Sequence, residues 1–117
     1  MATTVLIVDD HPSFRSSARA LLAAEGFDVV GEAEDAAGGL RRARELDPDL
    51  VLLDVQLPDL DGFDVAARIT VNGSAPAVIL VSSRERDDLG TQLPRSGARG
   101  FILKSELSAA RIKELLG

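Results

Sequence analysis

Short apolar runs alternate with helix-like patterns along this chain of 117 residues. Residues 5–8, 50–53 and 78–81 are aliphatic throughout, a pattern typical of strands buried on both faces of a parallel sheet. Shorter apolar runs at residues 29–30 and 101–103 predict two further strands. The pattern therefore predicts five strands, each separated from the next by residues with helical spacing.

The segments between the strands carry the spacing of amphipathic helices. Pro12 suits the first turn of a first helix and Gly26 suits its end. Asp35 is placed to cap a second helix that ends at Asp47-Pro48, although Gly38-Gly39 weakens it by about 1 kcal/mol per glycine relative to alanine. The apolar face of the first helix is formed by Phe14, Ala18, Leu21 and Leu22, and that of the second by Ala36, Leu40, Ala43 and Leu46. The apolar face of the third helix is formed by Val65, Ala66 and Ile69, and that of the last by Leu107, Ile112, Leu115 and Leu116.

The fourth helix has the least favourable sequence. Gly90 and Pro94 both lie inside residues 87–96, where this helix is expected. Proline in a helix interior costs about 3 kcal/mol, so we expect this element to be short, kinked or mobile.

Strands and helices that alternate in this order predict an α/β fold. Parallel strands need crossover connections, and helices must cover both faces of the sheet, which together indicate a doubly wound sandwich. We expect a five-stranded parallel sheet with the flavodoxin-like order 2-1-3-4-5. At this length the chain forms one domain, residues 1–117, with 45% hydrophobic residues to supply its core.

Composition and charge narrow the functional classes. Cysteine is absent, which excludes disulfides and thiolate metal sites. No basic leader precedes the first strand and no apolar run approaches the roughly 18 residues of a membrane span, so we expect a cytoplasmic protein without membrane contact. A net charge of −6 repels nucleic acid and suits cations or basic partner surfaces.

Polar residues end four of the predicted strands. Asp9-Asp10 follow the first strand, Asp54 the third, Ser82 the fourth and Lys104 the fifth. In a sheet of order 2-1-3-4-5 these residues converge at the carboxyl edge, where ligands bind. Clustered carboxylates repel one another unless a hard cation such as Mg²⁺ lies among them. With a lysine and a hydroxyl they make a site suited to phosphoryl groups, in which one carboxylate is the nucleophile.

The motifs VLIVDDHP, LVLLDVQLPDLDGFD, VILVSS and GARGFILK resemble those of response-regulator receiver domains and together span nearly the whole chain. The resemblance implies that a histidine kinase phosphorylates Asp54. It implies that Asp9 and Asp10 bind Mg²⁺ together with Asp54 and the backbone carbonyl of Gln56, and that Lys104 contacts the phosphoryl group. Such a domain is a switch and a phosphoacceptor, with only weak self-dephosphorylation, and is not an enzyme acting on outside substrates.

The resemblance also implies roles for residues around the phosphoacceptor. Ser82 corresponds to the hydroxyl that reorients toward the phosphoryl group, and Phe101 to the aromatic side chain whose rotamer follows it. Gln56 and Arg84 flank the phosphoryl group and tune its lifetime. Arg84 cannot act as a base, so we expect it to shield the phosphoryl group from water. In the family proline often follows the lysine, but here Ser105 does, and a trans peptide is favoured.

Each candidate residue also has a simpler explanation. Asp9 and Asp10 could cap the first helix. Asp54 could be a turn residue, although Pro58 and Gly62 follow at the spacing of the family and favour the nucleophile. Ser82 and Ser83 could be ordinary loop hydroxyls, Lys104 a lysine at the start of a helix, and Phe101 a core side chain. His11 would then be a loop residue beside the pocket, and Asp59 and Asp61 solvated acids of a turn.

Other functional classes fit the sequence less well. A phosphatase of the haloacid dehalogenase type needs a second aspartate two residues after the first, where this chain has Gln56. A flavodoxin-like nucleotide binder needs a phosphate loop after the first strand, where Asp9-Asp10 would repel phosphate. A degenerate, purely structural receiver is disfavoured because every expected pocket residue is present.

The segments VVGEAEDA and KSELSAARIKELLG resemble the receiver half of regulators with a C-terminal LuxR/NarL-type helix-turn-helix domain. We therefore expect the receiver portion of a longer bacterial transcription regulator, and a stand-alone receiver is the alternative. Homodimerisation would use the fourth helix, fifth strand and fifth helix. The native reading frame after residue 117 distinguishes the two possibilities, because a stop codon there would contradict a longer regulator.

Overall fold

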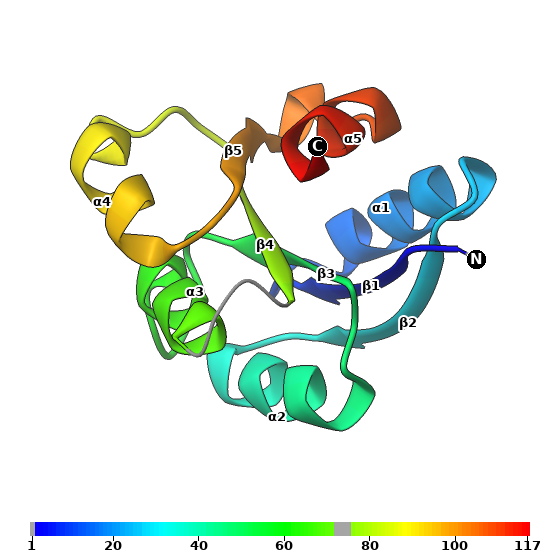
Figure 1. The fold of residues 1–117 in the computed structure, drawn as a ribbon, viewed down its shortest axis with the longest axis horizontal. Helices are drawn as coiled ribbons and strands as arrows, with labels where there is room; N and C mark the ends of the chain where they lie inside the picture. Colours follow the sequence, from blue (N-terminus) through cyan, green and yellow to red (C-terminus); the bar gives the residue numbers. More distant parts are fainter. Residues whose placement is uncertain (1, 72–75) are drawn as a thin grey trace.

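Five parallel strands form one sheet whose order is β2-β1-β3-β4-β5 (Figure 1). In this computed structural model, which describes residues 2–71 and 76–117, the strands are β1 Thr4–Val8, β2 Asp28–Ala33, β3 Leu50–Asp54, β4 Ala77–Ser82 and β5 Gly100–Leu103. Every neighbouring pair is parallel. The predicted strand order and the doubly wound α/β class are confirmed.

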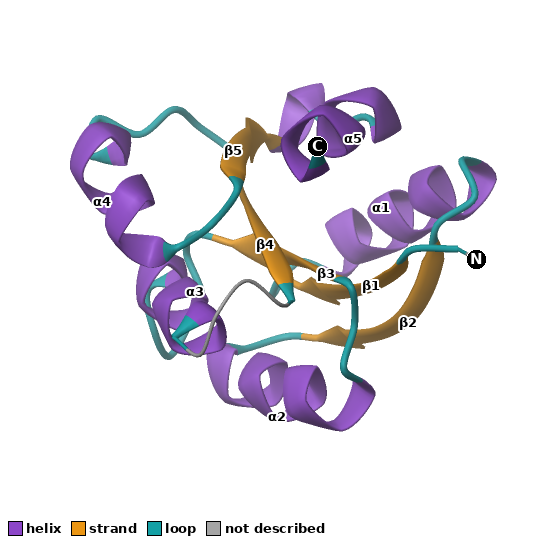
Figure 2. Cartoon of the chain, viewed as in Figure 1, coloured by secondary structure: helices purple, strands orange, loops and turns teal. Residues whose placement is uncertain are grey.

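Helices cover both faces of this sheet (Figure 2). They are α1 Pro12–Ala24, α2 Ala36–Leu46, α3 Gly62–Thr70, α4 Leu89–Ser96 and α5 Ala109–Leu116, and a short 3-10 helix, η1, spans Lys104–Glu106. Helices α1 and α5 lie on one face, and α2, α3 and α4 lie on the other. In the part of the chain that the structure describes, none of the helices is long and apolar enough to cross a membrane.

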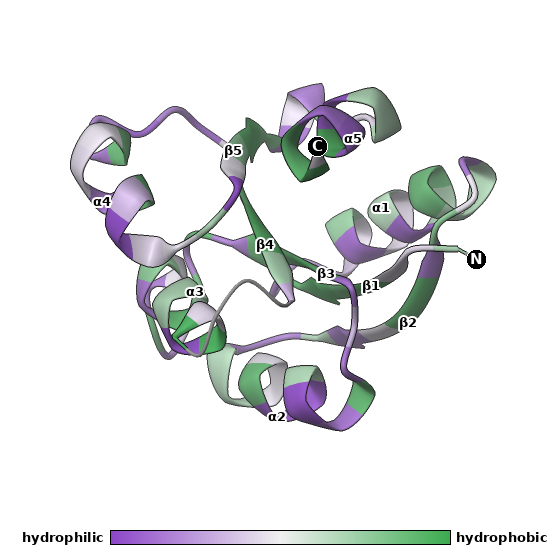
Figure 3. Cartoon of the chain, viewed as in Figure 1, coloured by the Kyte–Doolittle hydropathy of each residue, from purple (hydrophilic) through white to green (hydrophobic). Residues whose placement is uncertain are grey.

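Alternate residues of each central strand enter two separate hydrophobic cores. Val5 and Ile7 pack beneath α1 and α5, whereas Leu6 and Val8 pack against α2 and α3. Strands β3 and β4 are buried along their whole length, as their aliphatic sequences predict. The sheet therefore forms the apolar interior that separates the polar helix surfaces in Figure 3. This interior holds the strand ends at fixed positions.

Residues of the turn after β3 cap two helices. Asp59 accepts hydrogen bonds from the backbone N–H groups of Ala36 (2.8 Å) and Ala37 (3.0 Å), at the start of α2. Asp61 is the N-cap of α3 and accepts from the N–H of Phe63 at 2.8 Å. Both acids are exposed, as expected, but they are not merely solvated turn residues. They tie the loop of the candidate site to the helices on one face.

The two glycines of α2 have a packing role that helix propensity does not indicate. A Cβ at Gly39 would approach Val8 Cγ1 to 2.9 Å, and one at Gly38 would lie 2.9 Å from the capping oxygen of Asp35. The helix nevertheless spans the predicted segment, capped by Asp35 and ended by Asp47. The glycines thus lower the helix propensity of α2 but allow the helix to lie close to the sheet.

Helix α4 is short, as predicted, with 8 residues, although α5 has the same length without an internal glycine or proline. Arg86 makes paired hydrogen bonds at 3.1 and 2.9 Å to Asp88, the N-cap residue of α4, and lies over the ring of Phe63 in α3. Pro94 lies inside the helix without ending it, and the helix stops at Gly97, which has a left-handed backbone.

Gly62→Ala should destabilise the fold and disturb the loop that carries Asp54. A Cβ at position 62 would collide with the backbone carbonyl of Asp54 and with Val55 Cα, neither of which can move freely. We expect a loss of at least about 2 kcal/mol in the free energy of unfolding, measured by urea denaturation.

Gly90→Ala is the matched control, because nothing lies within 4 Å of a Cβ built there. On an exposed helix position this exchange should add up to about 1 kcal/mol of stability. Equal effects of the two substitutions would contradict the steric role of Gly62.

Candidate functional site

The register of the sheet places four candidate residues at one edge. Val8 pairs with Leu53 in the parallel ladder, so Asp9 and Asp54 occupy equivalent positions on neighbouring strands. Ser82 ends β4 one residue beyond the partner of Asp54. The convergence predicted from the strand ends is therefore a direct consequence of strand pairing.

Lys104 reaches the same edge from β5. Ser82 pairs with Leu103, so Lys104 is the first residue beyond the last pair and begins η1. Its ammonium group lies 4.6 Å from the centre of the Phe14 ring of α1, and its side chain is only 12% exposed. Phe14 thus covers the lysine from the helix side, a contact for which the sequence gives no signal beyond helical periodicity.

Asp54 is a buried carboxylate in a charged environment. One oxygen, Oδ1, accepts a hydrogen bond from the backbone N–H of Gln56 at 3.1 Å, and Oδ2 lies 3.4 Å from Lys104 Nζ. The pKa of Asp54 is raised from 3.8 to about 6, first by burial and then by the negative charge of Asp9, against the lowering effects of Gln56 and Lys104. The side chain is therefore mostly ionised at pH 7 and more basic than an ordinary aspartate.

Asp9 is completely buried and only partly compensated. Its Oδ1 accepts a hydrogen bond from the backbone N–H of His11 at 2.8 Å. Lys104 Nζ lies 2.6 Å from Oδ2 as an ion pair, but without the alignment of a hydrogen bond, and Oδ2 has no hydrogen-bond donor within the described residues. A buried carboxylate oxygen without a donor is costly and suits a bound cation.

The donor set fits a divalent metal ion. Asp9, Asp10, His11 and Asp54 each offer one ligand atom, and these atoms lie within 4.8 Å of one another. Asp10 is 37% exposed and does not cap α1, because His11 occupies the N-cap position without a side-chain hydrogen bond. The three carboxylates could hold Mg²⁺, which prefers oxygen ligands. The further ligand expected from the Gln56 carbonyl stays a prediction.

His11 lies within the site rather than beside it. Its Nδ1 is 2.9 Å from Asp9 Oδ1, 3.1 Å from Asp10 Oδ1 and 3.9 Å from Asp54 Oδ2. The sequence offered one signal for this placement, because His11 directly follows the two aspartates.

The residues expected to act as switch and lifetime elements lie around this centre. Ser82 is buried, and its Oγ accepts a long hydrogen bond of 3.3 Å from the backbone N–H of Arg84. Arg84 and Gln56 are exposed and line a shared hollow of about 370 Å³. Phe101 is half-buried and lines a groove of about 590 Å³ between α4, β5 and α5. The switch and lifetime roles of these residues stay predictions.

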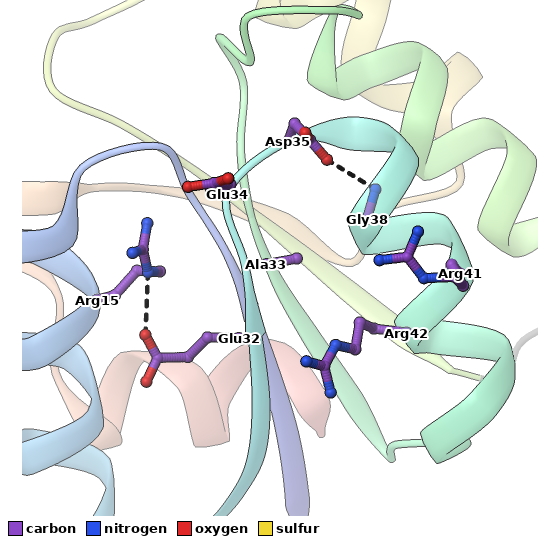
Figure 4. A pocket seen from close by; sticks show the side chains of 8 residues that line it. All are labelled: Arg15, Glu32, Ala33, Glu34, Asp35, Gly38, Arg41 and Arg42. Atoms are coloured by element: carbon purple, nitrogen blue, oxygen red, sulfur yellow. Dashed lines mark hydrogen bonds and ion pairs between the residues drawn. The ribbon is translucent and has the colours of Figure 1, made fainter.

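A separate pocket lies beside β2 and is lined by residues of α1, β2 and α2 and of the loop between β2 and α2 (Figure 4). Its volume is about 320 Å³, and its lining includes Arg15, Arg41, Arg42 and Glu32 but none of the clustered carboxylates. Arg15 donates to Glu32 at 3.0 Å and to the backbone carbonyl of Asp9 at 2.7 Å. This arginine therefore supports the backbone of Asp9 from outside the carboxylate cluster.

Comparison with known proteins agrees with this geometry. The family model described as the response regulator receiver domain matches residues 5–116. This chain belongs to the response-regulator receiver domains. The solved receiver domain of NarL from Mycobacterium tuberculosis is 35% identical with a TM-score of 0.84, covering 99% of this chain and 98% of that one. The resemblance stated from the sequence motifs is confirmed.

Two further relatives show the range of the family. BvgA of Bordetella pertussis, described as a positive transcription regulator of virulence factors, is 41% identical over 106 residues, which cover 91% of this receiver and 51% of BvgA. CheY of Borrelia burgdorferi, solved with CheX, BeF3 and Mg²⁺, is 26% identical with a TM-score of 0.83, covering 97% of this receiver and 86% of that chain. The chain spans about half the length of the curated relatives it matches.

Asp54→Asn should make the metal-free receiver more stable near neutral pH. Folding raises the pKa of Asp54 from 3.8 to about 6, so the folded state favours the protonated carboxyl and loses stability as pH rises through this window. Above pH 6 the ionised carboxylate lowers the free energy of unfolding by up to about 3 kcal/mol, and a neutral asparagine at this position avoids that loss. Urea unfolding in EDTA should favour Asp54→Asn by about 1–3 kcal/mol at neutral pH, with the difference closing in acid.

Asp88→Asn is a control of opposite sign. The hydrogen bond from Arg86 lowers the pKa of Asp88, so its carboxylate stabilises the fold above its ordinary pKa of 3.8 and loses that contribution as pH falls. This variant should be less stable than wild type at neutral pH, and the deficit should fade in acid. If the advantage of Asp54→Asn did not narrow on acidification, repulsion at the buried carboxylate would not be its cause.

Proposed function

We propose that this receiver accepts a phosphoryl group on Asp54 from a histidine kinase, in a reaction that requires Mg²⁺. The observation that carries the proposal is the position of Asp54, a buried carboxylate between Asp9 and Lys104 at the carboxyl edge of the sheet. A structural turn residue would not need two charged neighbours or a raised pKa.

The side chains around Asp54 suit attack on phosphorus. A carboxylate oxygen of Asp54 forms the new O–P bond while the P–N bond of phosphohistidine breaks, and the departing imidazole takes a proton from solvent. The Gln56 N–H holds one oxygen and so orients the carboxylate. Lys104, 3.4 Å from the other oxygen, places positive charge where the phosphoryl oxygens would arrive.

Asp9, Asp10 and Asp54 are the residues that would hold Mg²⁺. When bound, this ion would neutralise the carboxylates and the incoming phosphoryl oxygens. The buried, donor-free Oδ2 of Asp9 supports a cation in this position, and the CheY relative solved with BeF3 and Mg²⁺ supports magnesium in particular.

We infer that phosphorylation is read at the surface formed by α4, β5 and α5. Ser82 ends β4 beside Asp54, and Phe101 lines the groove on that surface, so a movement at the hydroxyl has a short path to it. That surface could also support a homodimer. The output would be the regulation of transcription, as described for BvgA. The whole protein would be cytoplasmic, and its receiver would contact neither DNA nor outside substrates.

Asp54→Ala should abolish uptake of the phosphoryl group. We expect wild type to take up label from acetyl phosphate or a cognate kinase when Mg²⁺ is present and to lose this ability in EDTA. Phosphate-binding gel electrophoresis or mass spectrometry measures the modified fraction.

Asp59→Asn is a matched control, because Asp59 lies in the same loop but caps α2. It should keep phosphorylation while lowering stability modestly. Label on the Asp54→Ala protein, or uptake unaffected by EDTA, would contradict the proposed phosphoacceptor or the proposed metal, respectively.

Arg84→Ala should shorten the lifetime of the phosphorylated state severalfold. Arg84 lines the same hollow as Gln56 beside the phosphoacceptor, and its guanidinium cannot activate water as a base. The half-life is measured after removal of the phosphodonor. Arg41→Ala, at an exposed arginine on α2, should leave it unchanged, and an unchanged or longer half-life for Arg84→Ala would rule out shielding.

A further inference from the structure

We propose that His11 is a nitrogen ligand in the metal site of this receiver. The site would then bind Zn²⁺ or Co²⁺, which accept imidazole, more tightly than Mg²⁺. The inference rests on the proposed metal site but adds a ligand of a different class to its carboxylates. It predicts that first-row transition ions compete with Mg²⁺ for the receiver.

The position of His11 Nδ1 matches that of a ligand sharing one ion with the aspartates. Two ligands bound to one ion at about 2.1 Å are about 3 Å apart when adjacent and about 4.2 Å apart when opposite. Nδ1 lies 2.9 Å from Asp9 Oδ1, 3.1 Å from Asp10 Oδ1 and 3.9 Å from Asp54 Oδ2. These three separations are close to that interval, and all four ligand atoms lie within 4.8 Å of one another, so a small shift of the side chains would let one cation contact the ring nitrogen and the three oxygens.

The histidine backbone is held in place, and Nδ1 of its ring faces the carboxylates and the Lys104 ammonium, which lies 3.4 Å away. The N–H of His11 donates to Asp9 Oδ1 at 2.8 Å, its carbonyl accepts from the N–H of Arg15 at 3.1 Å, and Pro12 follows at the start of α1. The side chain itself is 60% exposed. Because the backbone is already fixed, only the side-chain torsions lose freedom when the ring engages an ion.

A separate observation points to a cation at this place. Asp9 is completely buried, yet its Oδ2 has no hydrogen-bond donor within the described part of the chain. Lys104 Nζ lies 2.6 Å from that oxygen and 3.4 Å from both Asp54 Oδ2 and His11 Nδ1, so one ammonium faces a cluster of three carboxylates. A divalent ion among these ligands would compensate the charge that one lysine leaves.

The identity of the donor atoms decides which ions benefit. Mg²⁺ prefers an octahedral shell of oxygen ligands and water, whereas imidazole suits Zn²⁺, Co²⁺, Ni²⁺ and Cu²⁺. His11 is the only histidine and the chain has no cysteine, so imidazole coordination can come from this residue alone. The alternative arrangement is an Nδ1–H group that donates to Asp9 and coordinates nothing.

Nitrogen NMR of wild-type protein separates these arrangements. Protein labelled with ¹⁵N-histidine, purified without a polyhistidine tag, is titrated with ZnCl₂ in a non-coordinating buffer at pH 8. We expect a saturating shift at Nδ1, the atom that faces the aspartates. A shift confined to Nε2 would indicate adventitious surface binding and overturn the proposal, as would the absence of any ring shift.

Calorimetric titration of variants tests metal selectivity. His11→Ala should weaken Zn²⁺ and Co²⁺ binding by at least about tenfold and change Mg²⁺ binding by less than about threefold. Ser13→Ala, at an exposed position in the same helix turn, should change neither. Equal losses for all three ions, or none, would overturn the proposal. His11→Gln provides a second substitution if circular dichroism shows that His11→Ala is unfolded.

Phosphorylation with Mg²⁺ is measured on the same samples, so the two proposals can fail separately. Absence of label on wild type with Mg²⁺ would refute the phosphoacceptor function without affecting the Nδ1 result. Label together with an unshifted Nδ1 would leave the phosphoacceptor in place and remove His11 from the metal site.

Discussion

The repulsion between two buried carboxylates, Asp9 and Asp54, is the constraint on which the site depends. Neighbouring parallel strands bring them to one edge, and burial of both would raise the free energy of the fold without a cation. Lys104 supplies one positive charge, 2.6 Å from Asp9 and 3.4 Å from Asp54. Because one ammonium compensates two carboxylates incompletely, the folded domain favours additional positive charge at this place. The same imbalance that lowers stability would favour a bound metal ion.

The rest of the fold keeps this unfavourable arrangement from relaxing. Two hydrophobic cores hold the central strands from both sides, so the strand ends cannot separate to relieve the repulsion. Gly62 lies against the backbone of Asp54, and Asp59 ties the same loop to α2. Apolar packing around the sheet therefore stabilises the fold, whereas the clustered carboxylates at its carboxyl edge destabilise it. This division explains why the reactive side chains all lie outside the strands or on their last residues.

The sequence sufficed for the strands, the strand order and the four clustered side chains, because hydrophobic periodicity and strand ends depend on local patterns. Contacts between residues that are distant in the sequence could not be predicted from it. Asp59 caps a helix that begins 23 residues earlier, and Phe14 lies over Lys104 on a different element. Gly39 appeared only to weaken α2, since the proximity of Val8 becomes evident only once the helix is packed. The histidine beside the aspartates was visible, but the direction of its ring was not.

The position of Lys104 also indicates how a charge change at Asp54 would spread. In the present arrangement its ammonium is closer to Asp9 than to Asp54, and Phe14 covers it from the other side. Phosphorylation would replace the single charge of the Asp54 carboxylate by a phosphoryl dianion, which adds about one negative charge and would draw the ammonium away from Asp9. Asp9 would then carry an uncompensated charge in a buried position, which only a retained cation could offset. Phosphorylation and metal binding are thus expected to favour each other, because each supplies the charge that the other leaves unbalanced.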